Sequence, residues 1–437
     1  MAKIYKSKWI IACDGTIYEN CALKVDEGKI EEIIGQNDIN QEGTYHIKDF
    51  ENAVITPGFI NLHNHLQYTN IGKTKLKGLK ENIKKVFTDI KKHYHLAGIS
   101  RQSFVYKLAD LLSEYFCYTR EDKIKSFKKG LELSLLNGTT CICELSRETK
   151  YFELLNDTPI KTYLFFELFS DSTKSSKEEF RNIQKKINKL LKQKSESTFV
   201  GVAPHSVTCV HKRLFKILAK YCKKNNILTT IRISESKDET DWVKYGFSDS
   251  DILGAFCGNK KFEPAITGVS PVVYLMNLGV LNKQTIATYG NYLTESDLEI
   301  LKENKVSFCY CPRVSKKLHN SLLDFKTVNE VFQKRYGFGS NSLAFNDDLS
   351  LLNEVKSVND GILNTEEVIL HLTKYPAKIL RLDNMIGTLE QGKDADFNVF
   401  KLNENEDYNS ILNKIRPDYV YIKGHKMVSK GKIVNHI

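Results

Sequence analysis

The stretch "FINLHNH" (59–65) indicates how this chain folds. It follows "AVITPG" (53–58), so an apolar run resumes as a buried strand after a proline–glycine break. His63 and His65 stand two residues apart, and on a strand their side chains project to the same side. Two neutral imidazoles on one face suit zinc or iron. The stretch therefore predicts the start of a metal site at the C-terminal end of a strand, and other segments have to supply the remaining ligands.

Outward from this stretch, short apolar runs alternate with longer amphipathic ones. The runs expected to form strands are "TTCICEL" (139–145), "IKTYLFFELF" (160–169), "TFVGVAPHS" (198–206), "ILTTIRISE" (227–235), "TIATYGNYL" (285–293), "KVSFCYCP" (305–312) and "RYGFGSNS" (335–342). Runs such as "KEEFRNIQKKINKLLKQ" (177–193) predict helices, and Thr294 with Asp297 forms a capping pattern. This alternation predicts an α/β fold, a (β/α)8 barrel over residues 57–385, with its chemistry at the C-terminal strand ends.

Both ends of the chain contain short alternating runs separated by tight turns. We expect residues 1–56 and 386–437 to pair into one small composite β domain of the sandwich type. Residues 71–125 are basic and helical in pattern, which predicts a lid or an inserted hairpin.

Composition narrows the class of partner. The 437 residues include 64 Lys+Arg and 53 Asp+Glu, a net charge of +11, but the lysines are spread along the chain. We therefore expect solvated helix faces and no nucleic-acid partner; the alternative, a polyanion partner, predicts salt-sensitive retention on heparin.

With no long apolar window we expect no membrane partner, and ten cysteines without a secretory signal favour reduced thiols in the cytoplasm. The pairs at 141–143 and 309–311 favour buried strand cysteines over a metal site.

Three segments resemble the amidohydrolase superfamily: "AVITPGFINLHNH" (53–65), "GVAPHSVTC" (201–209) and "IGTLEQGKDADFNVF" (386–400). The second is similar to the branch of cyclic-amidine deaminases and chlorohydrolases. "SESKDETDWV" (234–243), with "PHSVTC" (204–209), is most similar to aminodeoxyfutalosine deaminases. The resemblance covers nearly the whole chain. It implies a hydrolase of C–N bonds in a purine-nucleoside-like substrate, a mononuclear zinc or iron, and the homodimer that relatives often form.

In this family two first-strand histidines, a fifth-strand histidine and an eighth-strand aspartate hold the metal. The first pair matches His63 and His65, and the substrate-contacting histidine of the P-H-S segment matches His205. The proton-shuttling glutamate matches Glu235, but the fifth-strand ligand position holds Arg232. A sixth-strand histidine, which also shuttles protons in relatives, is replaced by Tyr289, and the eighth-strand aspartate by Asn341.

These replacements oppose metal binding. A guanidinium stays protonated, has no lone pair to give and repels a cation, and asparagine offers only a neutral amide oxygen. We hypothesise a metal-free site in which Arg232 takes the place of the ion, donating hydrogen bonds to Asn341 and to the ring nitrogens of His63 or His65. The alternative is a rebuilt metal site, and its candidate ligands are Cys141, Cys143, Cys309, Cys311, Glu235, Asp347 and Asp348.

Function therefore divides into two classes. Descent implies an amidohydrolase with weak or altered deaminase-like activity, in which Glu235 is catalytic. The alternative is a catalytically inactive pseudoenzyme that binds a small molecule or a partner protein through Arg232, His205, Tyr289 and Asn341. For Glu144 and Glu167, which end apolar runs, substrate contact, helix capping and a buried ion pair all stay open. Three further histidines are expected on the surface or in the core: His211, His319 and His371.

Overall fold

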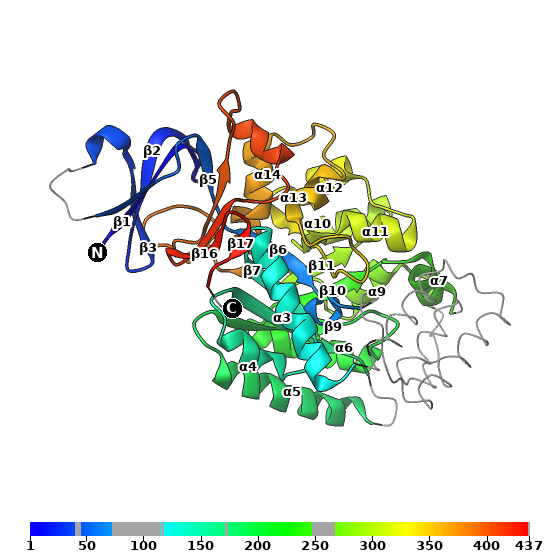
Figure 1. Ribbon diagram of the computed structural model, residues 1–437. Coiled ribbons are helices and arrows are strands. Elements are labelled where there is room, and N and C mark those ends of the chain that lie inside the picture. The colour runs from blue at the N-terminus through cyan, green and yellow to red at the C-terminus, as the bar shows by residue number, and fades with distance from the viewer. Residues whose placement is uncertain (40–44, 72–114, 116–117, 171–173, 247–266, 436–437) are drawn as a thin grey trace.

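Eight parallel strands form the centre of the molecule (Figure 1). The computed structural model describes residues 1–39, 45–71, 115, 118–170, 174–246 and 267–435. The eight strands are β6 (Phe59–Asn64), β7 (Thr139–Ser146), β8 (Lys161–Leu168), β9 (Thr198–Pro204), β10 (Thr229–Ile233), β11 (Thr285–Tyr289), β12 (Ser307–Tyr310) and β13 (Tyr336–Phe338). They pair in chain order from β6 to β13. The predicted strand runs are therefore confirmed.

The first and last strands meet, which brings the sheet round into a barrel. A parallel bridge joins Asn64 to Asn341, just beyond the end of β13. The backbone N–H of Asn341 donates to the carbonyl of His63, and that of His65 donates to the carbonyl of Asn341, each over 2.9 Å. The barrel is thus closed at the histidine pair, and the predicted (β/α)8 architecture is confirmed.

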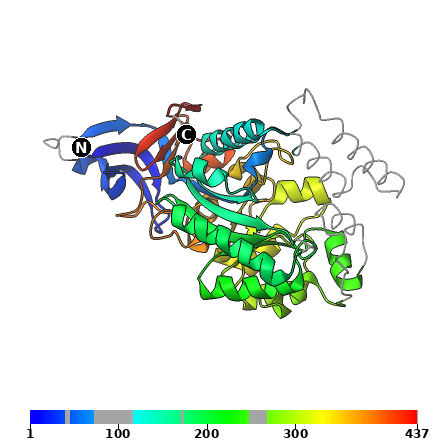
Figure 2. The same ribbon diagram turned by 90° about the horizontal axis from the view of Figure 1, so that it is seen from below.

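Helices surround the strands on the outside of the barrel (Figure 2). They are α3 (Arg120–Leu136), α4 (Tyr151–Asn156), α5 (Ser176–Gln193), α6 (Lys212–Lys224), α7 (Lys237–Tyr245), α9 (Pro271–Asn277), α10 (Glu295–Glu303), α11 (Pro312–His319), α12 (Phe325–Phe332), α13 (Leu351–Lys356), α14 (Thr365–Leu372) and α15 (Lys374–Leu380). The predicted cap of α10 is present, because Thr294 and Asp297 form a reciprocal capping box. None of the helices in the described ranges has both the length and the apolar content needed to cross a membrane.

A second, mixed sheet is built from both ends of the chain. Its strands are β1 (Lys3–Ile11), β2 (Ile17–Asp26), β3 (Lys29–Gly35), β4 (His46–Asp49), β5 (Ala53–Pro57), β14 (Phe397–Lys401), β15 (Tyr419–Ile422), β16 (His425–Ser429) and β17 (Lys432–Ile433). β5 pairs with β1 on one side and with β14 on the other, so the blue and red strands of Figure 1 share one sheet. The expected pairing of the two ends is confirmed, while the domain boundaries stay a prediction.

Two other expectations concern the interior and the lid. Cys141, Cys143, Cys309 and Cys311 are buried free thiols on or beside strands of the barrel, as predicted. The predicted lid at 71–125 falls largely on residues 72–114 and 116–117, which lie outside the described residues.

Candidate functional site

The side chains singled out in the sequence gather at the C-terminal rim of the barrel. His63 lies on β6, Arg232 on β10, and Tyr289 at the end of β11. Parallel strands present their carboxyl ends at one rim, which brings these distant residues together. Tyr289 and Asn341 both have left-handed backbones, with φ of 75° and 59°. Such strained non-glycine residues cluster at functional sites.

Arg232 is the central cation of this site, and its residue is only 8% exposed. Its Nη2 donates to Nε2 of His65 over 2.8 Å. Because that nitrogen accepts, the ring proton sits on Nδ1, which lies 3.1 Å from the carbonyl of Leu145 and donates to it. Burial and the nearby guanidinium lower the pKa of His65 well below its usual range. His65 is therefore neutral, and the guanidinium occupies the lone pair that a metal ion would require.

Two carboxylates face the guanidinium. Oε1 of Glu167 lies 3.6 Å from Nη2, and Oε2 of Glu235 lies 3.9 Å from Nη1 of Arg232. Burial alone raises the pKa of Glu235, but the Arg232 charge and a hydrogen bond from His319 bring it down to about 2. An ion pair between Arg232 and Glu235 is thus present, and Glu167 is a second counter-ion. For Glu167, the buried ion pair is therefore present, and substrate contact stays open.

Asn341 and His63 differ from the expected arrangement. The amide nitrogen of Asn341 donates to the hydroxyl of Tyr289, and within the described part of the chain its Oδ1 has no hydrogen-bond partner. Neither ring nitrogen of His63 has a partner there either. The predicted hydrogen bond from Arg232 to His63 or His65 is present, and its acceptor is His65, whereas the predicted bond to Asn341 is wrong. The physical reason is that the amide of Asn341 donates to the hydroxyl of Tyr289, while the guanidinium of Arg232 donates to His65.

His319 is a site residue that the sequence analysis placed on the surface or in the core. It is the last residue of α11, its side chain is 1% exposed, and its Nε2 lies 3.2 Å from Oε1 of Glu235. Glu239 also supports this segment, because its Oε2 accepts the backbone N–H of Glu235 over 2.8 Å. Burial raises the pKa of Glu239 to about 8. His319 lies in none of the quoted motifs, and Glu239 lies in "SESKDETDWV" (234–243) without being singled out, since their roles depend on how α7 and α11 meet the rim.

Two further predicted residues complete the rim. Nε2 of His205 lies 3.9 Å from Oε1 of Glu167, and its ring packs 4.5 Å from that of Phe169. Glu144 is fully buried and accepts the backbone N–H of Leu66 through both oxygens, at 3.1 and 3.2 Å. Glu144 therefore caps the short turn that follows the histidine pair, and burial raises its pKa.

The donors at the rim do not fit a metal ion. In residues 1–39, 45–71 and the other described ranges, no three His, Cys, Asp or Glu side chains surround one point. Cys309 and Cys311 contact each other, with 3.8 Å between their sulfurs. Asp348 is held by Arg313 at 2.8 Å and accepts the N–H of Ser350, which is itself the cap of α13. The candidate ligands of a rebuilt site are thus engaged elsewhere or do not converge.

A shallow recess lies at this rim, and in this structure the side chains around it leave no room for a water molecule. It is lined by His63, Leu145, Glu167, Ala203, Pro204, His205, Thr230, Ile231, Arg232 and Thr288. Sites that enclose a whole drug-sized ligand span roughly 300–1,000 Å³, so a ligand at this rim requires the lining side chains to move apart.

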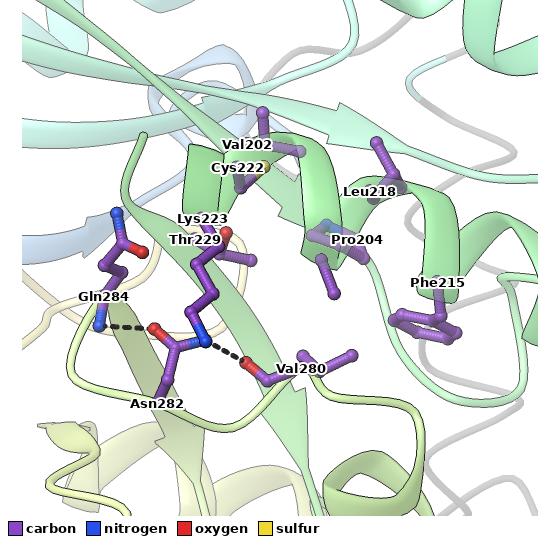
Figure 3. Close-up of a pocket in the computed structure, with 11 residues that line it drawn as sticks. Val202, Pro204, Phe215, Leu218, Cys222, Lys223, Thr229, Val280, Asn282 and Gln284 are labelled. Atoms are coloured by element: carbon purple, nitrogen blue, oxygen red, sulfur yellow. Dashed lines mark hydrogen bonds between the residues drawn. The ribbon is translucent and has the colours of Figure 1, made fainter. Parts of the chain in front are cut away.

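A larger hollow lies between α6 and the strands β9 and β10 (Figure 3). Its walls are mostly apolar, and the side-chain amide of Asn282 is already paired within the loop, as Figure 3 shows, with Val280 and Gln284. It offers few convergent polar atoms, so the rim recess is the better candidate site.

Comparison with known proteins agrees with the fold. A model of the Amidohydrolase family matches residues 54–427. The 5-methylthioadenosine/S-adenosylhomocysteine deaminase of Clostridium tetani is 23% identical over 94% of this chain and 89% of that protein. The aminodeoxyfutalosine deaminase of Nitratiruptor sp. is 23% identical over 94% and 96%.

Solved structures show the same architecture. Helicobacter pylori aminofutalosine deaminase in complex with methylthio-coformycin superposes with a TM-score of 0.79 at 19% identity, covering 98% of this chain and all of that one (100%). An adenosine deaminase from Xanthomonas campestris with bound zinc has a TM-score of 0.76 at 18% identity, covering 99% and 94%. At these identities the structures support the fold alone.

Proposed function

This chain belongs to the amidohydrolase family, and from that premise we propose that it binds a purine-nucleoside-like small molecule at the barrel rim without metal-dependent hydrolysis. The observation that carries the proposal is the 2.8 Å hydrogen bond from Nη2 of Arg232 to Nε2 of His65. A histidine that accepts from a guanidinium has no lone pair left for a metal ion, and a fixed cation beside it repels one.

Charge supports the same proposal. In family members a dication together with one aspartate contributes a formal +1, and Arg232 together with neutral Asn341 contributes the same +1. The counter-ions Glu167 and Glu235 therefore meet a cation of comparable formal charge in the absence of metal. A buried cation that is hydrogen-bonded and paired is tolerated where an isolated one is not.

The polar atoms left without partners indicate the ligand class. Those at the rim, within the described residues, include both ring nitrogens of His63, Oδ1 of Asn341, Nε of Arg232 and Oε1 of Glu167. Buried polar atoms normally find partners, so this set of donors and acceptors calls for a ligand, or waters, with both kinds of group. A heterocyclic base carries both at its edge, and the relatives named above act on adenosine-type nucleosides. By resemblance, His205 matches the histidine that contacts the substrate in the family, and Glu235 matches the glutamate that shuttles protons.

In this proposal the residues bind and orient the ligand. Arg232, which lines the recess, is held by its hydrogen bond to the neutral His65. His205 also lines the recess, and its side chain is 13% exposed. Leu145, Ala203 and Ile231 line the recess with apolar atoms that exclude water from the faces of a flat ring.

A slow deaminase is a second candidate, and one observation favours it. Oε1 of Glu235 lies 3.2 Å from Nε2 of His319, a carboxylate–imidazole pair that can accept and return a proton. In such a reaction Glu235 would take a proton from the attacking water and His319 would help return it to the departing ammonia. The amidine C–N bond would break as a C=O bond forms, and the second proton of the water would pass to the ring nitrogen of the amidine.

One experiment separates the two candidates. Purified protein is titrated with 5′-methylthioadenosine by calorimetry, the incubated mixture is analysed for ammonia and 5′-methylthioinosine, and metal is measured by elemental mass spectrometry. We expect saturable binding, no product above the uncatalysed rate, and metal far below one equivalent. Product formation at any metal content would favour the slow deaminase. Absence of binding would contradict the proposed ligand class.

A further inference from the structure

Glu167 presents an unpaired carboxylate oxygen to the rim recess. The residue stands near the end of β8, is 5% exposed and lines the recess beside Arg232 and His205. In the part of the chain that the structure describes, its Oε1 has no hydrogen-bond donor. Both nearby nitrogens, Nη2 of Arg232 at 3.6 Å and Nε2 of His205 at 3.9 Å, lie beyond hydrogen-bond distance.

The guanidinium does not satisfy this oxygen because it is directed elsewhere. The same Nη2 atom of Arg232 donates to His65 at 2.8 Å, and Nη1 is shared with Glu235 at 3.9 Å. The attraction between Glu167 and Arg232 is therefore Coulombic and leaves the carboxylate without a donor. A buried carboxylate in that state is costly unless a further donor reaches it.

The walls of the recess indicate what that donor is attached to. Leu145, Ala203, Pro204 and Ile231 contribute apolar groups to the lining, beside the charged groups of Glu167 and Arg232. A flat heterocycle has apolar faces and polar edge groups, so its chemistry matches a lining of both kinds. An amino group donates to a carboxylate, whereas an oxo group at the same place sets one acceptor against another.

We propose that Glu167 is a specificity-determining residue that accepts a hydrogen bond from the exocyclic amino group of a 6-aminopurine and so rejects the 6-oxo form. This inference rests on the proposed nucleoside-binding function and names the chemical feature that the site recognises. A site built to hydrogen-bond one group discriminates strongly against an analogue that leaves its buried polar atoms unpaired.

The test compares two ligands that differ only at this group, 5′-methylthioadenosine and 5′-methylthioinosine. Calorimetry gives both dissociation constants for the wild type and for Glu167→Gln; if the amino form is turned over, its KM takes the place of Kd. We expect the wild type to prefer the amino form by about tenfold or more. In Glu167→Gln the amide can also donate to an oxo group, so the preference should fall to within about threefold. Glu196→Gln makes the same change at a side chain that is 94% exposed and should keep the wild-type ratio.

Each outcome decides a different point. If Glu167 only held Arg232 in place, its replacement would weaken both ligands alike and leave their ratio unchanged, which would overturn this inference alone. A wild type that prefers the amino form, with a Glu167→Gln variant that loses the preference, would support it. A wild type that binds neither nucleoside would overturn the proposed function and this inference with it.

Discussion

Nε2 of His319 lies 3.2 Å from Oε1 of Glu235, although 84 residues separate them in the chain. The two side chains are 1% and 6% exposed, so their hydrogen bond is shielded from water. Glu235 has Arg232 at 3.9 Å on its other oxygen. The carboxylate of Glu235 is thus contacted by two side chains, His319 at the end of α11 and Arg232 near the end of β10.

Removing the imidazole tests this support. We expect His319→Phe to lower the free energy of unfolding by about 1–3 kcal/mol, because a buried carboxylate oxygen of Glu235 loses a partner. Urea denaturation followed by circular dichroism measures the change. His319→Gln retains an N–H donor and should lose less. A Phe variant as stable as the wild type would mean that the pair contributes nothing to the fold.

Restoring the family's ligands tests the role of the arginine. The double variant Arg232→His with Asn341→Asp removes the fixed cation and adds an imidazole and a carboxylate beside His63 and His65. We expect it to bind about one zinc ion per chain, as measured by elemental mass spectrometry after dialysis. Asn341→Asp alone keeps the guanidinium and should stay far below one equivalent. A folded double variant that takes up no zinc would show that the strand ends have moved away from a metal geometry.

Much of the fold could be predicted from local patterns, whereas most contacts of the site could not. Strand–helix alternation determines the barrel, and the two-residue spacing of His63 and His65 places both side chains on one face. The substitution at 232 even predicts its hydrogen bond to His65. The pairing of His319 with Glu235 depends instead on where α11 ends relative to β10, and no local pattern carries that distance.

The hydrogen-bond partner of Asn341 is a second contact that could not be predicted from the sequence. An asparagine amide can hydrogen-bond to several groups at similar cost, and the choice depends on ångström-scale differences in position. The hydroxyl of Tyr289 lies within reach of that amide, and the guanidinium of Arg232 does not bond to it. Sequence identifies the groups at the rim, but the backbone twist at the strand ends decides which of them pair.

A buried histidine away from the site predicts a pH dependence of stability. His371 on α14 is 4% exposed, stacks on the ring of Tyr336 and donates from Nδ1 to its carbonyl over 3.2 Å. Burial lowers its pKa from 6.5 to about 4. The unfolded chain therefore binds this proton more readily, so stability is full above about pH 6.5 and is lost as the pH falls toward 4.

The size of this effect can be measured directly. At pH 5 the contribution of His371 should be about 2 kcal/mol smaller than at pH 7.5. Urea denaturation at both values should show a smaller pH difference, by that amount, in His371→Gln than in the wild type. His425→Gln replaces an exposed histidine of β16 and should keep the wild-type difference. Equal differences in all three proteins would contradict the assignment.

A buried lysine of the barrel forms ion pairs with two aspartates next to the second sheet. Lys161, at the start of β8, is 1% exposed, and its Nζ lies 2.9 Å from Asp394 and 2.8 Å from Asp396, just before β14. Lys161→Ala would leave two buried carboxylates without their shared cation, so we expect a loss of about 3–5 kcal/mol in unfolding free energy. Lys29→Ala is the matched control, because Lys29 contacts the same Asp394 but is 51% exposed, and it should cost at most about 1 kcal/mol. Chemical denaturation of both variants measures the contrast. Equal losses would mean that the lysine of the barrel is solvated like the one at the surface, and that the apolar contacts between the sheets hold the junction on their own.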